Sequence, residues 1–304
     1  MKRTNNIMKA FLPIIVVFVI QNALAVMGME VVFMEKLATF SGGDYTDIAD
    51  SMMDAIQTAD FTVWVSIAYT LICGITFSVW YYRLRHNKQV MGGLSNVSEV
   101  ASDIKTEGKG VFEGYRISII PGLIMLAVGL QYLCTYLMNF LSTMFPEWLV
   151  NYEKLMENMG LDSWENYTVP LIIYTVLLGP IVEELTFRGL TFTYARRATT
   201  FFRANLLQAI LFGLLHMNPL QGIYAAALGL VFGVIYEKSR NILVTIGLHI
   251  LFNLAGTFLS NFMELGDNAI SFYFIVLGSL IVTYIGYELT VKSIPQRVEI
   301  EEKF

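Results

Sequence analysis

Apolar positions in this chain gather in long runs that are separated by polar connections. Each run is about 17–25 residues long, the length that an α-helix needs to cross the hydrocarbon core of a bilayer. None of the connections is long and polar enough to form a separate soluble domain. The pattern predicts one bundle of about eight membrane-spanning helices, over residues 8–29, 61–82, 117–140, 168–190, 200–217, 220–236, 242–260 and 271–290.

The composition agrees with this pattern. Hydrophobic residues make up 55% of the 304 positions and charged residues only 15%, whereas a soluble domain contains about 25% charged residues. The excess of apolar side chains must therefore face lipid. We expect an all-α, polytopic transmembrane bundle surrounded by membrane lipids.

Lysine and arginine residues are distributed unevenly between the two sets of alternating connections. The set that includes both chain ends holds 17 of the 20, the opposite set holds two, and Arg188 lies inside a predicted span. Because cytoplasmic connections are enriched in these residues, we expect both termini in the cytoplasm. The N-terminus is similar to a secretory signal peptide, but seven further spans follow, so we expect a retained first helix. No strong basic patch suggests nucleic-acid binding.

The chain changes in character near residue 167. The three spans before this point are separated by long connections, whereas the five spans after it are joined by short ones and carry the buried polar residues. We therefore predict a three-span scaffold over 1–167, a membrane core that carries the site over 168–290, and a cytoplasmic tail over 291–304.

Two adjacent carboxylates inside an apolar run give the strongest sign of a functional site. An ionisable side chain at bilayer depth costs at least ~2.5–3.5 kcal/mol and marks a functional site by default. Glu183 and Glu184 lie in one predicted span, and Arg188 follows one turn later. On a helix Arg188 shares a face with Glu184, while Glu183 points about 100° away. We expect Arg188 to neutralise Glu184, and Glu183 to project into the bundle. The alternative is that the Arg188–Glu184 pair only joins helices and that Glu183 faces a polar crevice.

The helix that carries the carboxylates needs a particular length and shape. Pro180 removes one intrahelical hydrogen bond, which favours a kink that can open space for water beside the carboxylates. The alternative is a proline that the membrane helix simply tolerates. A span that ended at residue 190 would leave Glu183 far from His216, at the outer end of the next span. We therefore expect a long tilted helix that continues through about Ala195.

Two further polar pairs lie in later spans. Phe212 and His216 are spaced i, i+4, as are His249 and Asn253, so each pair shares a helix face. Such pairs commonly only join helices in lipid. Together with the carboxylates, however, they suit hydrolysis. A carboxylate and a histidine can take a proton from water, and a second histidine with an asparagine can stabilise an oxyanion.

The same residues could also hold a metal ion. Glu183, His216 and His249 are legitimate Zn²⁺ ligands that leave a fourth position open for water. The usual helical zinc-protease sequence, His-Glu-x-x-His, does not occur in the chain. The sequence is therefore compatible with a mechanism that uses a metal-bound water and with one that uses a metal-free water.

Small residues mark places where helices can approach closely. Gly229 and Gly233 form a Gly-x-x-x-Gly sequence in the sixth predicted span, and Gly213 and Gly247 lie near the two histidines. Small residues at this spacing allow close helix packing in lipid. We interpret all four as packing positions.

Three short motifs, taken together, resemble those of a known family. Each is weak alone, but all three occur in order within apolar helices, over about residues 170–260. They resemble the signature of the CAAX-protease and bacteriocin-processing (CPBP, or Abi) family, which includes the Ras-converting CaaX prenyl endopeptidases. The motifs are Glu183-Glu184-x-x-x-Arg188, Phe212-x-x-x-His216 and His249-x-x-x-Asn253.

The resemblance implies an intramembrane protease in a bacterial plasma membrane, with its site in a polar cavity within the bundle. By position, Glu183 and His216 would activate the attacking water, and Glu184 with Arg188 would hold the geometry. His249 and Asn253 would stabilise the oxyanion. The substrate would be a membrane-associated peptide or protein, prenylated or bacteriocin-like. Family members are commonly described as metalloproteases, although a metal-free, glutamate-dependent mechanism has been argued for the prenyl-protein relatives.

Two other functions fit the same residues. The chain could be a non-catalytic bacteriocin self-immunity or membrane scaffold protein that keeps the family fold. It could also be an ion- or proton-coupled transporter that uses the buried carboxylates. The transporter is disfavoured because the two halves of the sequence show no repeat symmetry.

Overall fold

The computed structural model describes residues 2–40, 42, 45–86, 112–259, 266 and 268–295. Every regular element within these residues is a helix, and the all-α prediction is confirmed. Most of the predicted tail, 291–304, and most of the basic connection 83–116 lie outside the described residues.

Seven helices in the described part of the chain are long and apolar enough to cross a membrane. This confirms the prediction of a polytopic integral membrane protein. Six of them are single α-helices, and the seventh, over residues 169–196, consists of five consecutive segments. The single helices are α1 (Lys2–Thr39), α3 (Ala59–His86), α6 (Ile119–Met144), α12 (Pro219–Ser239), α13 (Ile242–Leu259) and α14 (Ala269–Ser293).

The predicted span over 200–217 is shorter than a full crossing. It is helix α11 (Phe201–Leu215), with 15 residues. At about 1.5 Å per residue this helix falls short of a hydrocarbon core about 30 Å thick. Its C-terminal end is set by His216, which caps the helix, and by Met217, which has a φ angle of 54°. The described residues thus contain seven helices of membrane-spanning length, and the eighth predicted segment is this shorter apolar helix.

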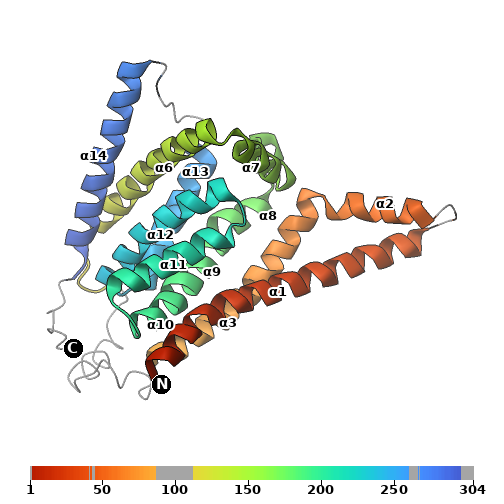
Figure 1. The fold of residues 1–304 in the computed structure, drawn as a ribbon, viewed down its shortest axis with the longest axis horizontal. Coiled ribbons are helices and arrows are strands. Elements are labelled where there is room, and N and C mark those ends of the chain that lie inside the picture. Colours follow the sequence, from red (N-terminus) through yellow and green to blue (C-terminus); the bar gives the residue numbers. More distant parts are fainter. Residues whose placement is uncertain are drawn as a thin grey trace. The chain divides into compact units, whose positions relative to one another are not determined.

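Two of the predicted connections contain short helices. They are α2 (Tyr45–Ile56) and α7 (Pro146–Asn158). Helix α2 packs against α1 and folds back beside its C-terminal half (Figure 1). Its acidic side chains are mostly exposed, as expected for a solvated face.

The chain forms two compact units. The first consists of Met1–Tyr82 and Leu137–Gly233, and the second of Arg83–Tyr136 and Val234–Phe304. Both units include residues from each side of position 167. The predicted functional division at that position stays a prediction.

In the first unit, α3 runs parallel to the helix over 169–196. Tyr69 contacts Tyr174 near the start of both helices, with ring centroids 6.4 Å apart. Near their ends, Trp80 Nε1 donates a hydrogen bond of 2.9 Å to the hydroxyl of Tyr194. Residue numbers therefore rise together along the two helices. The second and fourth predicted spans cross the membrane in the same direction, as the alternation of connections requires.

Helices α11 and α12 form a closely packed antiparallel pair in the same unit. A Cβ atom added to Gly229 would lie 2.9 Å from Ala209 Cα, and one added to Gly222 would lie 2.9 Å from the Gly213 carbonyl oxygen. The Gly-x-x-x-Gly interpretation is thus confirmed for Gly229, as is the packing role of Gly213. Gly247 differs, because no atom lies within 4 Å of a Cβ added there.

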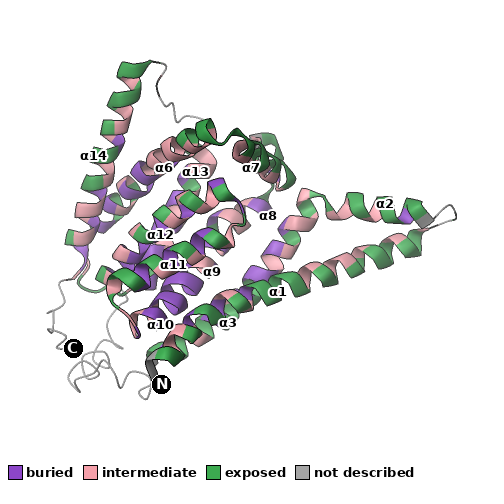
Figure 2. Cartoon of the chain, viewed as in Figure 1, coloured by how far each residue is buried: buried purple, intermediate pink, exposed green. Residues whose placement is uncertain are grey.

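Burial in the first unit is concentrated on the helix over 169–196. All eight residues from Leu185 to Phe192 are buried, including the charged Arg188. Figure 2 shows this purple region around α9 and α10, in contrast to the largely exposed surface of α1. The apolar residues that α1 exposes are those expected of a helix that faces lipid.

The second unit is built on α6, α13 and α14. Helices α6 and α14 run antiparallel, because Gly122 faces Thr290 and Gly129 faces Thr283. A Cβ atom added at Gly122 would lie 2.7 Å from the backbone nitrogen of Thr290. Close backbone contact therefore holds this pair together.

Candidate active site

The predicted carboxylate helix is continuous and long, but it is not a regular α-helix. It ends at Arg196, so the expected extension through about Ala195 is confirmed. Two π-helical segments flank the turn that carries the glutamates, and π-helical turns occur frequently at functional sites. In order, the segments are α8 (Val169–Ile172), η2 (Ile173–Leu178), α9 (Gly179–Glu184), η3 (Leu185–Phe192) and α10 (Thr193–Arg196).

Pro180 lies at the start of α9, directly after the first π-helical segment. Proline cannot donate the backbone hydrogen bond of a regular helix, and a change of hydrogen-bonding register accommodates that loss. The proline and the widened turns thus precede Glu183 by a single helical turn. The kink itself stays a prediction.

Glu184 and Arg188 form a fully buried ion pair. Arg188 Nη1 donates to Glu184 Oε1 at 2.8 Å, and neither side chain is exposed to solvent (0% for both). The guanidinium also lies over two aromatic rings, 4.7 Å from the centroid of Phe212 and 5.1 Å from that of Phe232. The predicted pairing of Arg188 with Glu184 is therefore confirmed, and the ring contacts add cation–π attraction.

Glu183 lies in a different environment. Its side chain is half-buried, whereas that of Glu184 is completely buried. The charge of Glu183 acts on the hydroxyl groups of Tyr69 and Tyr174 and on the guanidinium of Arg188. The two tyrosine hydroxyls lie 3.5 Å apart. Glu183 therefore lies near a polar group of side chains from α3 and η2.

The two tyrosines were not among the residues predicted from the sequence. Tyrosines are common in membrane proteins and most often lie at the membrane interface. Tyr69 and Tyr174 also occur far apart in the chain. No local spacing connects them, so only the packing of α3 against η2 identifies them.

His216 lies at the C-terminal end of α11 and has a defined orientation. Its Nδ1 atom is 2.9 Å from the carbonyl oxygen of Phe212. Because a carbonyl oxygen only accepts hydrogen bonds, Nδ1 carries the hydrogen. The lone pair of the neutral ring then lies on Nε2, which can accept a proton. The next helix starts immediately, with Asn218 Oδ1 accepting a hydrogen bond of 3.1 Å from the backbone of Gln221.

The aromatic ring of Phe212 connects His216 to the ion pair. The centroids of Phe212 and His216 are 5.1 Å apart, with the rings edge to face. Another neighbour of Phe212 is the guanidinium of Arg188, 4.7 Å from the ring centroid. The predicted carboxylate helix and His216 thus lie in one compact unit and share a neighbour.

His249 and Asn253 lie in α13, in the second compact unit. His249 is buried and Asn253 is half-buried. Their i, i+4 spacing in one helix gives them a common face, as predicted. Their action on the same reaction centre as Glu183 stays a prediction.

No three His, Cys, Asp or Glu side chains among the described residues form a group that could hold a metal ion. Of the proposed ligands, Glu183 and His216 lie in the first unit and His249 lies in the second. Zinc binding by them stays a prediction.

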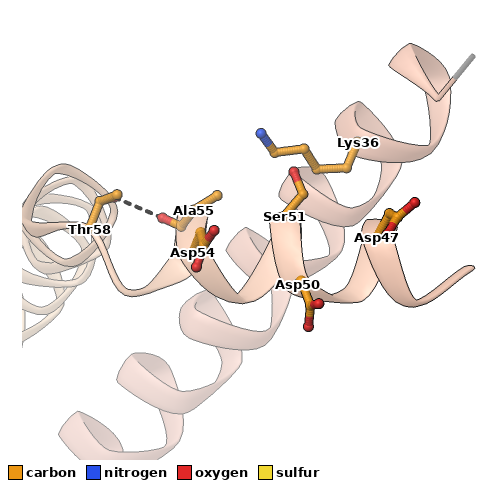
Figure 3. A pocket seen from close by; sticks show the side chains of 7 residues that line it. All are labelled: Lys36, Asp47, Asp50, Ser51, Asp54, Ala55 and Thr58. Atoms are coloured by element: carbon orange, nitrogen blue, oxygen red, sulfur yellow. Dashed lines mark hydrogen bonds between the residues drawn. The ribbon is translucent and has the colours of Figure 1, made fainter. Parts of the chain in front are cut away.

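Two surface cavities lie away from these residues. One is formed between the end of α1 and α2, where Lys36 faces a helix that carries Asp47, Asp50 and Asp54 (Figure 3). The other is lined by residues of α7 and of the connection between α2 and α3. The polar cavity expected beside Glu183 stays a prediction.

Comparisons with known proteins agree with the motifs. Residues 165–255 match the family model described as Type II CAAX prenyl endopeptidase Rce1-like. The chain is also 35% identical over 86 residues to the Bacillus subtilis (strain 168) protein named "Putative membrane peptidase YdiL".

The extent of these matches is limited. The aligned part covers 28% of this chain and 35% of the Bacillus protein, so the chain spans about a third of that relative's length. No solved structure matches this chain. All six predicted site residues fall within 165–255, the segment that is similar to the Rce1-like, or CPBP, family.

Proposed function

We propose that this protein is an intramembrane endopeptidase. One observation carries the proposal: of two adjacent carboxylates, Glu184 is fully buried against Arg188, while Glu183 is half-buried beside polar groups. A buried charge needs a partner, so Arg188 accounts for Glu184. We assign the activation of water to the other carboxylate, Glu183.

In the proposed reaction Glu183 and His216 activate the water. One proton passes from the water to the Glu183 carboxylate, with Nε2 of His216 as hydrogen-bond acceptor. The resulting hydroxide attacks the carbonyl carbon of the scissile peptide bond. The C–N bond then breaks, and the leaving amine takes the proton that the water gave up. The products are a new carboxylic acid and a new amine, which become a carboxylate and an ammonium group once the acid proton has passed to the amine.

His249 and Asn253 have a separate role in this proposal. Both side chains can donate hydrogen bonds to the oxyanion of the tetrahedral intermediate. Loss of one such donor in other hydrolases lowers kcat by about 10²–10³-fold. Their spacing on one face of α13 supports this role.

The substrate in this proposal is a membrane-associated peptide or protein, because the site residues lie on apolar, membrane-length helices. A prenylated C-terminal segment and a bacteriocin-like peptide are the two candidate classes. We further propose a bacterial plasma membrane as the location, with both termini in the cytoplasm. Although α11 is short, it runs antiparallel to α12 and so still reverses the direction of the chain. The distribution of Lys and Arg in the sequence supports this orientation.

The proposal is tested with the purified protein in liposomes. The probes are a fluorogenic peptide with a farnesylated C-terminal CaaX sequence and the same peptide without the farnesyl group. The variants are Glu183→Gln and His216→Ala, with Glu153→Gln as a control on the exposed surface of α7. In parallel, the new N-termini of membrane peptides are quantified in cells that express each form.

We expect cleavage that depends on Glu183 and His216 and that is unchanged in Glu153→Gln. If wild type and Glu183→Gln show the same cleavage of the probes and the same abundance of every new N-terminus, the endopeptidase proposal is wrong. An immunity phenotype that survives Glu183→Gln would favour the non-catalytic scaffold instead. Zinc analysis of the purified protein, and activity after chelation, would decide between metal-bound and metal-free water.

A further inference from the structure

Two amide side chains on α11 lie buried beside the Glu184–Arg188 pair. Gln208 is completely buried and Asn205 is 6% exposed. Neither residue belongs to the three family-like motifs. Burying an amide group in an apolar interior is costly unless it forms hydrogen bonds, so the bonds of these two side chains indicate what they do there.

The hydrogen bonds of this amide pair converge on one backbone segment of α12. Gln208 Nε2 donates to the carbonyl oxygen of Gly229 at 2.7 Å and to Asn205 Oδ1 at 2.8 Å. Asn205 Nδ2 donates to the carbonyl oxygen of the next residue, Leu230, at 3.0 Å. The two amides are therefore fixed to each other and to α12.

The carbonyl oxygen of Gly229 is also a neighbour of the ion pair. Arg188 Nη2 lies 3.5 Å from it, a longer contact than the 2.7 Å of Gln208. Both donors thus share one acceptor, and Gln208 holds the shorter bond. With Gln208 in place, the guanidinium remains close to Glu184, at 2.8 Å, and over the Phe212 ring.

The packing of α12 is adapted to these side chains. A Cβ atom added to Gly233 would collide with Asn205 Oδ1 and would lie 2.9 Å from Gln208 Nε2. The second glycine of the Gly-x-x-x-Gly sequence therefore makes room for the amide pair. The first glycine, Gly229, supplies the shared carbonyl.

We propose that Gln208 and Asn205 are positioning residues for the proposed peptidase site. By occupying the Gly229 carbonyl, Gln208 keeps Arg188 on Glu184 and against Phe212, which in turn contacts His216. Loss of Gln208 leaves that carbonyl free to draw the guanidinium away from Glu184. The orientation of Glu183, the next residue in the chain, and of His216 then changes. This inference rests on the proposed function.

The first test compares kinetic constants of Gln208→Leu and Gly233→Ala with those of wild type, on the farnesylated probe. We expect kcat to fall about tenfold in each variant, because the loss of one hydrogen bond corresponds to about that change in rate. KM should stay within about twofold of the wild-type value. Thr70→Val and Gly278→Ala are the matched controls. Thr70 is buried but bonds only to its own helix, and a Cβ added at Gly278 meets open space.

The second test compares melting temperatures. Gln208→Leu is made in the wild-type and in the Glu184→Gln backgrounds, and we expect it to lower the Tm more in the wild-type background, where the ion pair is intact.

Two outcomes would overturn the inference. In the first, Gln208→Leu lowers the Tm while kcat per folded molecule stays at the wild-type value. In the second, the shift in Tm caused by Gln208→Leu is the same in the wild-type and Glu184→Gln backgrounds, which shows that Gln208 and the ion pair are independent. The Tm comparison needs no activity. A wild-type protein that cleaves nothing therefore refutes the proposed function and still leaves the coupling of Gln208 to the ion pair measurable.

Discussion

The buried ion pair leads to a prediction about stability. Substitution of one member should lower the free energy of unfolding strongly, whereas substitution of both members should not. Arg188→Met leaves the Glu184 carboxylate buried without its partner at 2.8 Å. Breaking a buried pair in this way costs about 3–5 kcal/mol. The contacts of the guanidinium with Phe212 and Phe232 are lost as well, but methionine sulfur over the same rings restores about 0.3–1.5 kcal/mol each. The expected net loss is therefore about 3–5 kcal/mol.

The double variant Glu184→Leu/Arg188→Met removes both charges together. Replacement of a buried pair by apolar residues of similar size is neutral or stabilising by about 1–4 kcal/mol. We therefore expect the double variant to be at least as stable as wild type, although the proposed site is lost. Unfolding by sodium dodecyl sulfate in mixed micelles, followed by tryptophan fluorescence, measures the free energy of unfolding of all three proteins.

An exposed ion pair with the same i, i+4 spacing serves as the control. Lys292 and Glu288 also lie 2.8 Å apart, but their side chains are 70% and 33% exposed. Lys292→Met should leave the unfolding transition where it is, because solvent screens such pairs. Two results would contradict this prediction: the same free energy of unfolding for Arg188→Met and wild type, or a double variant that is as unstable as the single one.

Three further predictions concern packing and topology. Gly213→Ala should destabilise the protein by about 1–3 kcal/mol, because the new Cβ would collide with the Gly222 carbonyl. Gly247→Ala is the control: its Cβ meets open space, so the free energy of unfolding should not change in the same experiment. Trp80→Phe removes the 2.9 Å hydrogen bond from α3 to α10 and should cost about 1 kcal/mol; an unchanged unfolding midpoint would contradict this. A membrane-impermeant thiol reagent applied to intact cells should label Asp54→Cys but label Arg203→Cys only after permeabilisation, and the reverse pattern would refute the predicted orientation.

The part of the site that lies within single helices could be predicted from the sequence. The pairing of Glu184 with Arg188 follows from i, i+4 spacing, which acts within one element and needs no tertiary information. The length of the carboxylate helix followed from the requirement that Glu183 and His216 serve one site. Hydropathy, however, overestimated the length of α11. Its apolar run includes His216 and Met217, which end the helix through backbone conformation rather than through polarity.

The residues that were missed depend on contacts between helices. Gln208 and Asn205 bond to backbone carbonyls of α12, and every residue has a carbonyl, so no sequence pattern identifies the partner. Tyr69 and Tyr174 meet only because α3 runs parallel to the carboxylate helix. The Gly-x-x-x-Gly sequence predicted close packing correctly, but it could not show that Gly233 makes room for polar side chains.

The different environments of the two glutamates have a common physical origin. An arginine at i+4 can neutralise only the carboxylate on its own face, and burying that pair is tolerable only when further groups hold the guanidinium. Here two aromatic rings and a backbone carbonyl do so. The first glutamate, on the adjacent face, is left half-buried and next to hydroxyl groups. A buried, charge-neutral pair thus lies beside a second carboxylate in a different environment, and this difference supports Glu183, rather than Glu184, as the proposed water-activating group.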